Sequence, residues 1–297
     1  MRELNYRPSQ VRRKVNTDTR TLGIASGAPS SAVSEPGYYR SIVDHILSSA
    51  SYHRQNSIVY ASHLFHEDTL QSIRTYCDGR CDGLFLIIPK SDAAIITALS
   101  DRGFPFVIVG DKGADNSVPC SDIDNVAAGI SAAEHLISLG HKRIAYTRGS
   151  PDASASSGRE TGFRSGLIQA GIAVDEELFG PAIGLRQWVL EVVKLPEARR
   201  PTAYFCFCDH DAFTLIKILE SLGISVPYDV SVMGVDDQHF GSDAPTLTTI
   251  RQPYERIATH AVEALLAQLT GNTNVAQRVL IPGELIVRSS TSPRRAE

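Results

Sequence analysis

Short runs of apolar residues alternate along this chain with stretches in which apolar residues recur every three or four positions. The runs are apolar throughout rather than at every second position, which is typical of strands covered on both faces of a parallel sheet. The predicted strands are Thr21–Ser26, Ser57–Ala61, Leu84–Ile88, Pro105–Val109, Ile144–Tyr146, Ala203–Phe207 and Val230–Val235, followed by Arg278–Ile281 and Glu284–Ser289.

Three amphipathic helices are clear from the spacing. Apolar residues line one helical face over 39–50, over 212–222 before Gly223, and over 257–269 before Gly271. Strand followed by helix, repeated, indicates an α/β fold with doubly wound parallel sheets. Because the pattern occurs twice, we predict two similar lobes, separated by a loop at Gly110–Asp124 with the boundary near Asp124.

Composition narrows the class of protein. The chain has 297 residues, of which 42% are hydrophobic and 21% charged, which is ordinary for a globular protein of two subdomains. No stretch approaches 18 apolar residues, and no apolar leader follows Met1, so we expect a cytoplasmic protein without a membrane span.

The five cysteines are predicted to be free thiols. No metal site is expected, and a capping or surface role is favoured for His135 and His141.

Charge is unevenly distributed along the chain. Residues 1–20 hold six basic side chains and two acidic ones, so this segment carries +4 while the rest of the chain carries −8. An acidic body is poorly suited to following a nucleic-acid backbone, whereas a short basic arm in front of it could contact one. A solvated terminus without such a role is the simpler interpretation for an arbitrary protein.

Candidate binding residues follow the strands, since ligands of open parallel sheets lie beyond the carboxyl ends of the strands. Ser26, Asp209 and the pair Asp236–Asp237 stand at such positions, and Arg159 lies in a segment after the 144–146 strand. Arginine donors and carboxylate acceptors converging in a cleft suit a polyhydroxylated or carbonyl-bearing ligand. Alternatively, Asp236 and Asp237 could hold Mg²⁺ in an enzyme, although the sequence has no phosphate-binding loop or nucleophile elbow.

Several long segments together resemble the effector-binding region of the LacI/GalR family of bacterial transcription regulators. The resemblance is carried by residues 124–146 (DNVAAGISAAEHLISLGHKRIAY), 158–163 (GRETGF), 201–237 (PTAYFCFCDHDAFTLIKILESLGISVPYDVSVMGVDD) and 244–266 (APTLTTIRQPYERIATHAVEALL). It extends from about residue 2 to residue 291, in the order of the family.

The resemblance implies the type I periplasmic-binding-protein fold, in which two lobes are joined by three crossovers. These crossovers would lie near Asp124, Gln252–Pro253 and Ile281–Gly283. The N-terminal lobe would comprise 20–123 plus 253–281, and the C-terminal lobe 124–252 plus 282–293, behind a hinge remnant at 1–19. The family also implies a homodimer built along the lobes.

The segment ELNYRPSQVRRKV (3–15) resembles the end of the family's DNA-binding headpiece and its hinge helix. The helix-turn-helix that precedes this segment in the family is absent from the sequence, so we expect operator DNA as a partner only with an upstream headpiece. A family hinge helix enters the minor groove and wedges a base step open. The residues that the resemblance assigns to that role are Pro8, Val11, Arg12, Arg13 and Val15.

The resemblance also assigns individual residues of this chain to the family's ligand site. Arg159 matches the family's ligand arginine, Asp236 an aspartate that accepts from the ligand, and Asp124 an aspartate at a crossover. Cys208 stands where sugar-binding members often carry asparagine, which speaks against a simple sugar. Its neighbour Phe207 could stack on a ligand ring or belong to the core. Asp209 and Asp237 have an alternative role as helix caps.

We therefore predict a non-enzymatic sensor, without a cofactor, that binds a small metabolite such as a sugar or nucleobase between its lobes and changes operator affinity. The ligand-binding prediction rests on Arg159, Asp236, Asp124, Phe207, Cys208 and Ser26. A solute-binding protein of a transporter with the same fold is the alternative function.

Overall fold

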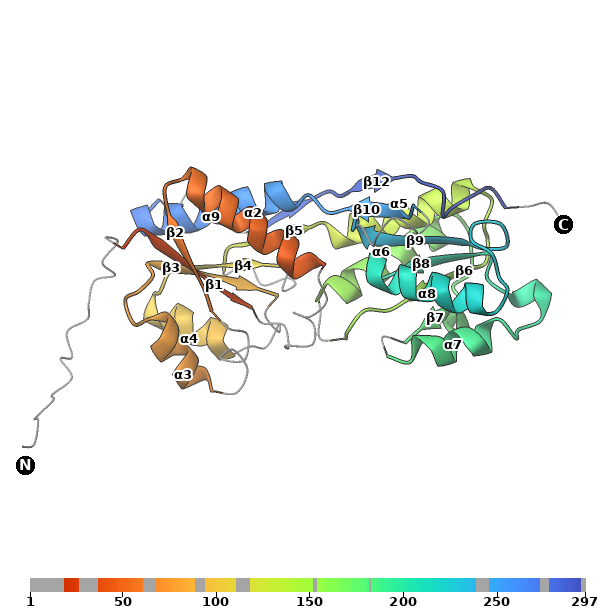
Figure 1. The fold of residues 1–297 in the computed structure, drawn as a ribbon, viewed down its shortest axis with the longest axis horizontal. Helices are drawn as coiled ribbons and strands as arrows, with labels where there is room; N and C mark the ends of the chain where they lie inside the picture. The colour runs from red at the N-terminus through yellow and green to blue at the C-terminus, as the bar shows by residue number, and fades with distance from the viewer. Residues whose placement is uncertain are drawn as a thin grey trace, which may run out of the picture.

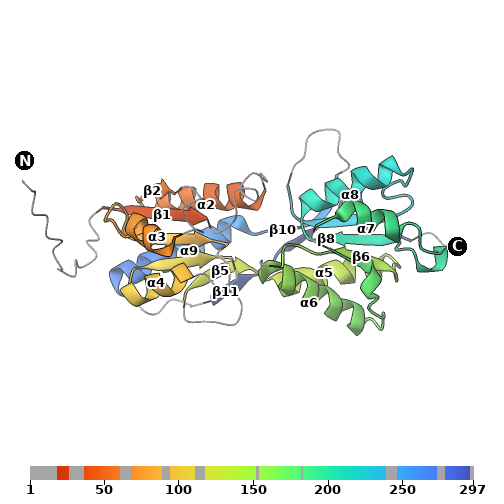
Figure 2. The ribbon, with the colours of Figure 1, turned by 90° about the horizontal axis from the view of Figure 1, so that it is seen from below.

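The computed structural model describes residues 19–26, 37–60, 68–88, 94–110, 118–151, 154–181, 183–238, 246–272 and 278–294. The chain forms two α/β lobes that lie end to end along the long axis of the molecule (Figures 1 and 2). Within the described residues, each lobe contains one six-stranded sheet. The predicted hinge residues lie outside the described residues: Pro8, Val11, Arg12, Arg13 and Val15.

The first sheet has the strand order β11-β5-β4-β3-β1-β2, and its neighbouring strands run parallel. Helices α2 (Tyr38–Tyr52) and α9 (Tyr254–Thr270) pack on one face, while α3 (Thr69–Tyr76) and α4 (Ala94–Arg102) cover the other (Figure 1). The strands are β1 (Thr21–Ser26), β2 (Asn56–Val59), β3 (Gly83–Ile87), β4 (Phe106–Val109), β5 (Cys120–Ile123) and β11 (Arg278–Ile281).

The side chains of β3 show why the strands are apolar throughout. Phe85 and Ile87 belong to the core formed with α2 and α9, whereas Leu84 and Leu86 belong to the core formed with α3 and α4. Successive residues of a strand point to opposite faces, so a strand covered on both sides is apolar at every position. The prediction of doubly wound parallel sheets is confirmed.

The second sheet has the order β12-β10-β9-β8-β6-β7, with β10 and β12 antiparallel and the other pairs parallel. Helices α5 (Asn125–Ser138) and α6 (Ser154–Gln169) cover one face, and α7 (Leu185–Val192) and α8 (Asp209–Ser221) the other. The strands are β6 (Ile144–Thr147), β7 (Phe179–Gly180), β8 (Ala203–Cys206), β9 (Ser231–Asp236), β10 (Thr248–Arg251) and β12 (Glu284–Ile286), and two short 3₁₀ turns are at Glu176–Leu178 and Glu197–Arg199.

The described chain passes between the lobes at three places. β5 of the first sheet leads into α5, β10 of the second sheet leads into α9, and β11 leads into β12. All three connections are short, so they can act together as a hinge between rigid lobes. None of the described helices has the length and hydrophobicity needed to cross a bilayer.

Three buried strands are absent from the sequence prediction: β7 has only two residues, and β5 and β10 contain polar residues. The predicted loop at Gly110–Asp124 is wrong over its last residues, where the fully buried β5 lies. β5 contains Ser121 and Asp122, which are 0% and 3% exposed. β10 contains Thr248 and Thr249, both completely buried. A search for apolar runs therefore overlooks buried strands that contain polar side chains.

Helices α5 and α6 approach each other so closely that their backbones touch. Gly158, Gly162 and Gly166 recur every four residues on α6 and face α5, from which Gly129 faces back. A Cβ at Gly162 would overlap the carbonyl oxygen of Val126. The close approach depends on these positions having no side chain.

His141 is only 3% exposed, so the predicted surface or capping role is wrong. Its Nδ1 lies 2.9 Å from Thr202 Oγ1, and its Nε2 lies 3.1 Å from both Ser231 Oγ and the carbonyl oxygen of Ser292. A carbonyl oxygen only accepts, so the bond to Ser292 requires the proton on Nε2. Burial lowers the pKa of His141, and the bond to Ser292 only partly opposes this effect.

We predict that Gly162→Ala lowers the free energy of unfolding by about 1–3 kcal/mol, because the added methyl group must push α5 away from α6. Thr161 is exposed on the same helix, and Thr161→Ala should change stability by less than about 0.5 kcal/mol. Urea denaturation measures both effects. Equal losses in the two variants would contradict the proposed packing constraint.

We also predict that acid destabilises the protein partly through His141. Because the folded-state pKa is lowered, the unfolded chain takes up a proton first, so stability falls as the pH drops below about 6.5. In urea denaturation at pH 7.5 and pH 5.5, His141→Gln should lose less stability on acidification than the wild type. His210→Gln, at an exposed position, is the control and should keep the wild-type loss. The same pH dependence in all three proteins would count against this role of His141.

Candidate functional site

Arg159 lies on α6 at the point where this helix is packed against α5, and it is 3% exposed. Its Nε donates to Asn125 Oδ1 at 2.9 Å, and its Nη1 donates to the carbonyl oxygen of Phe207 at 2.5 Å. The guanidinium carbon lies 4.5 Å from the centre of the Phe207 ring. Within the described residues Nη2 has no such partner, so its two N–H groups are available to a ligand.

Asn125 connects Arg159 to the first lobe. Its Nδ2 donates to Asp122 Oδ2 at 3.0 Å and to the carbonyl oxygen of Ile123 at 3.3 Å. Asp122 belongs to β5 of the first sheet and is buried. The orientation of Arg159 is therefore set by a hydrogen-bonded chain that crosses from one lobe to the other.

Asp236 ends β9 and is 6% exposed. Its Oδ1 accepts from Gln252 Nε2 at 2.5 Å. Burial raises the pKa of Asp236 to about 6, against the opposing effects of the Arg159 charge and the Gln252 hydrogen bond. Arg159 and Asp236 thus lie within electrostatic range of each other, as their shared assignment to a ligand site requires.

The backbone at Asp236 and Asp237 is strained, with φ of 125° and 60°. Such angles are uncommon for residues other than glycine and persist only where surrounding contacts impose them. Here Asp237 accepts from Arg251 Nε at 2.7 Å and from Arg288 Nη2 at 2.5 Å. Burial alone would raise the pKa of Asp237, but the bonds and charges of both arginines together lower it.

The two carboxylates of this pair have different hydrogen-bond partners. Asp236 bonds to Gln252, whereas Asp237 bonds to two arginines. Over the parts of the chain that the structure describes, no cluster of three or more His, Cys, Asp or Glu side chains could hold a metal ion.

The capping role considered for Asp209 is wrong, whereas the segment that Asp237 would cap lies outside the described residues. Asp209 is the first residue of α8, but its Oδ1 accepts from Thr249 Oγ1 at 2.7 Å and its Oδ2 from the backbone N–H of Gln238 at 2.8 Å. Burial, with the nearby charge of Asp236, raises the pKa of Asp209 well above its usual range. Asp209 fixes the segment that follows Asp236, and Asp237 is held by its arginines.

Three polar side chains of the site were not identified from the sequence. The hydroxyl groups of Tyr38 and Tyr254 and the Oε1 of Gln252 are buried without a hydrogen-bond partner. The two tyrosine rings lie 5.8 Å apart, and Asp236 acts electrostatically on both hydroxyls. Gln252 lies in the predicted crossover at Gln252–Pro253 and Tyr254 follows it, so their position in the sequence could have identified them. No feature of the sequence identifies Tyr38, because only the fold brings α2 next to this crossover.

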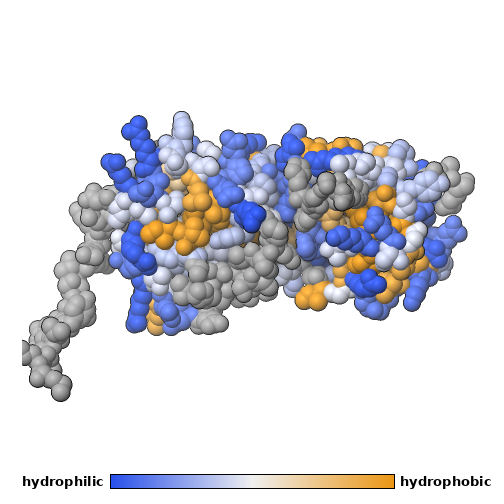
Figure 3. All heavy atoms as spheres, in the orientation of Figure 1, coloured by the Kyte–Doolittle hydropathy of each residue, from blue (hydrophilic) through white to orange (hydrophobic). Residues whose placement is uncertain are grey.

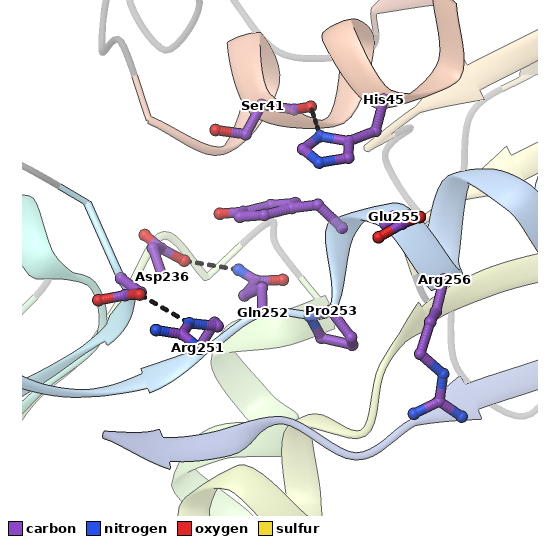
Figure 4. A pocket seen from close by; sticks show the side chains of 10 residues that line it. Ser41, His45, Asp236, Arg251, Gln252, Pro253, Glu255 and Arg256 are labelled. Carbon is purple, nitrogen blue, oxygen red and sulfur yellow. Dashed lines mark hydrogen bonds and ion pairs between the residues drawn. The ribbon is translucent and has the colours of Figure 1, made fainter. Parts of the chain in front are cut away.

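A pocket of about 400 Å³ adjoins these groups. It is lined by residues 251–256, by Ser41 and His45 of α2, and by Asp236 and Asp237. Figure 4 shows Ser41 and His45 on one wall and Asp236 with Gln252 on the other. This volume is in the range of small-molecule sites. Of the predicted ligand-binding residues, Asp236 lines this pocket.

The remaining predicted residues surround Arg159 or lie at the ends of elements. The Phe207 ring contacts Arg159 and also lies against Gly149, where a Cβ would be 2.6 Å from its carbon atoms. Asp124 caps α5 by accepting from the backbone N–H of Ala127 at 2.9 Å. Cys208 precedes α8 with a half-buried thiol whose pKa is raised by burial, and Ser26 is buried at the end of β1. Their contact with a ligand stays a prediction.

Comparison with known proteins identifies the family of this chain. A family model for a periplasmic binding protein-like domain matches residues 133–291. The HTH-type transcriptional repressor PurR of Erwinia tasmaniensis is 30% identical over 301 residues, covering 98% of this chain and 86% of the relative. The similarity to a transcription regulator therefore extends over both lobes.

Solved structures of transcription regulators share the fold. The transcriptional regulator CelR in complex with cellobiose has a TM-score of 0.80 and 26% identity, with 91% of this chain and 84% of that one covered. The transcriptional regulator LacI from Bacillus cereus subsp. cytotoxis has a TM-score of 0.83 and 25% identity, with 93% and 99% covered. The chain belongs to the LacI/GalR family of transcription regulators, of which it forms the ligand-sensing, effector-binding region.

Proposed function

We propose that this chain binds a small metabolite between its lobes and passes the binding event to operator DNA. The observation that carries the proposal is the meeting of Arg159 and Asp236 with three buried polar atoms that have no partner. Buried polar groups are costly unless they are hydrogen-bonded. An effector that supplied those bonds would bind with a favourable free energy and would bind best to the conformation that brings the groups together.

The coupling would act through the angle between the lobes. Gly37 at the start of α2 lies against the side chain of Gln238, which follows β9 of the other lobe. Closure of the lobes on an effector would alter this contact and the three crossings. The resulting change in operator affinity can be no larger than the difference in effector affinity between the two states, typically about 1–3 kcal/mol. In this proposal residues 3–15, with a headpiece before them, make the DNA contact.

We also propose that the chain acts as a homodimer built along the lobes. Tyr52 at the end of α2 is 85% exposed, and Val59 on β2 is 50% exposed. β2 is an edge strand, and Figure 3 shows apolar surface over this side of the first lobe. Edge strands and apolar patches of this kind are typical of surfaces that a second chain covers.

We predict that Arg159→Ala and Asp236→Ala abolish the rise in Tm that the effector produces, because each removes a group that the ligand contacts. A thermal-shift panel of sugars, nucleobases and small organic acids identifies stabilising compounds with the wild type. Arg102→Ala, at an exposed position on α4, is the control and should keep the full shift. Circular dichroism checks that the folds match. A normal response of both site variants to the identified compound would overturn the assignment.

For the homodimer, we predict that Val59→Asp shifts the protein from dimer to monomer, because a buried unpaired charge is costly at an interface. Sedimentation velocity measures the molar mass of both proteins. Leu70→Asp changes an exposed apolar residue of α3, which is 63% exposed, and should leave the dimer intact. A wild-type monomer, or a dimer that Val59→Asp does not weaken, would contradict the proposed interface.

A further inference from the structure

Phe207 lies between β8 and α8 and makes two different contacts with Arg159. Its carbonyl oxygen accepts from Arg159 Nη1 at 2.5 Å, and the guanidinium carbon lies 4.5 Å from the centre of its ring. Backbone and side chain of one residue thus hold the same guanidinium. The attraction between a guanidinium and the face of an aromatic ring is stronger where water is excluded, and Arg159 is only 3% exposed.

The Phe207 ring also lies against the backbone of Gly149. A Cβ at Gly149 would be 2.6–2.7 Å from three ring carbons, Cγ, Cδ1 and Cδ2, and such nearly equal distances place it over the ring rather than beyond its edge. Two groups cannot both lie over the centre of one face, so the guanidinium and Gly149 cover opposite faces. The protein therefore encloses the ring on both sides, which leaves neither face for stacking on a ligand.

The position of Phe207 is in turn fixed by the end of β6. Its backbone N–H donates to the carbonyl oxygen and to the Oγ1 of Thr147, both at 3.1 Å. Thr147 is the last residue of β6 and is 1% exposed. The segment from Thr147 to Gly149 thus contacts Phe207 through its backbone and through its ring, so the ring is a rigid surface for the guanidinium.

These contacts decide which part of Arg159 is left for a ligand. Its Nε donates to Asn125 and its Nη1 to Phe207. The guanidinium cannot turn without breaking these bonds or leaving the face of the ring. Its Nη2, which has no partner among the described residues, is therefore held in one orientation before any ligand binds.

Building on the proposed function, we infer that Phe207 is a positioning residue of the effector site, which supports the Arg159 guanidinium and does not stack on the effector. Without the ring, the guanidinium would populate other orientations, and an effector that needs Nη2 in one place would bind more weakly in proportion. Loss of a cation–π contact changes such a population by a factor of about 2 to 30.

Nuclear magnetic resonance of the effector-free protein tests the contact directly. The Nε–H signal of Arg159 is assigned as the one missing from the arginine side-chain spectrum of Arg159→Lys. Because an aromatic ring shifts the signals of protons held over its face, Phe207→Leu should move this signal, whereas Phe207→Tyr keeps the ring and should not. The control is Phe213→Leu, which removes another buried ring, on α8, and should leave the signal in place.

Isothermal titration calorimetry tests the consequence for binding. The probe is whichever of glucose, ribose, adenine, hypoxanthine and succinate raises the Tm of the wild type most. We expect Phe207→Leu to weaken its binding by a factor of about 2 to 30. Phe207→Tyr should restore the wild-type affinity, and Phe213→Leu should keep it.

An Arg159 signal that does not move in Phe207→Leu overturns the inference, because the ring then has no hold on the guanidinium. Wild-type affinity in Phe207→Leu, or an equal loss in Phe213→Leu, overturns it as well. A moved signal together with weaker binding that tyrosine restores supports it. If none of these compounds binds, the sensor proposal loses support for their classes, whereas the Arg159 signal alone still confirms or overturns the contact with Phe207.

Discussion

The burial of the Arg159 guanidinium is the constraint on which the rest of the site depends. A buried charge is costly unless hydrogen bonds and nearby charges compensate it. Arg159 receives that compensation from Asn125 on α5 and from Phe207 between β8 and α8. It can reach both because the glycines of α6 allow this helix to touch α5. A packing feature of the second lobe thereby decides where the donor of the site lies.

The opposite side of the site is held by the residues that form the crossings. Asp236 projects from a strained backbone, and that backbone is kept in place by contacts of Asp237 with Arg251 and Arg288. Arg251 is the last residue of β10, immediately before the chain crosses to α9. Gln252, in the crossing itself, bonds to Asp236 directly. A rotation of the lobes at this crossing acts on the same residues that position the acceptor, which gives closure and ligand contact a common structural basis.

Fold and chemistry contribute different parts of the functional conclusion. The paired lobes and the comparisons establish the family and its ligand-sensing region. Because one fold serves many ligands, the chemical class of the effector has to come from the side chains themselves. Here those side chains are the buried carboxylates, the Arg159 guanidinium, the Gln252 amide and the two tyrosine hydroxyls.

The sequence by itself determined the layered architecture, because the spacing of apolar residues is a local property that directly reflects which faces are covered. The bounds of β1 and β11 agree with the apolar runs, and α9 ends at the predicted Gly271, which adopts φ of 74°. Resemblance to the family then singled out Arg159 and Asp236. Only the tertiary structure decided which polar residues are buried, because their partners are distant in the sequence. Thr249 of β10 bonds to Asp209, 40 residues away, and Tyr38 packs against Tyr254, 216 residues away. The sequence shows which residues are polar. Only the folded chain brings each buried polar residue to the hydrogen-bond partner that compensates for its burial.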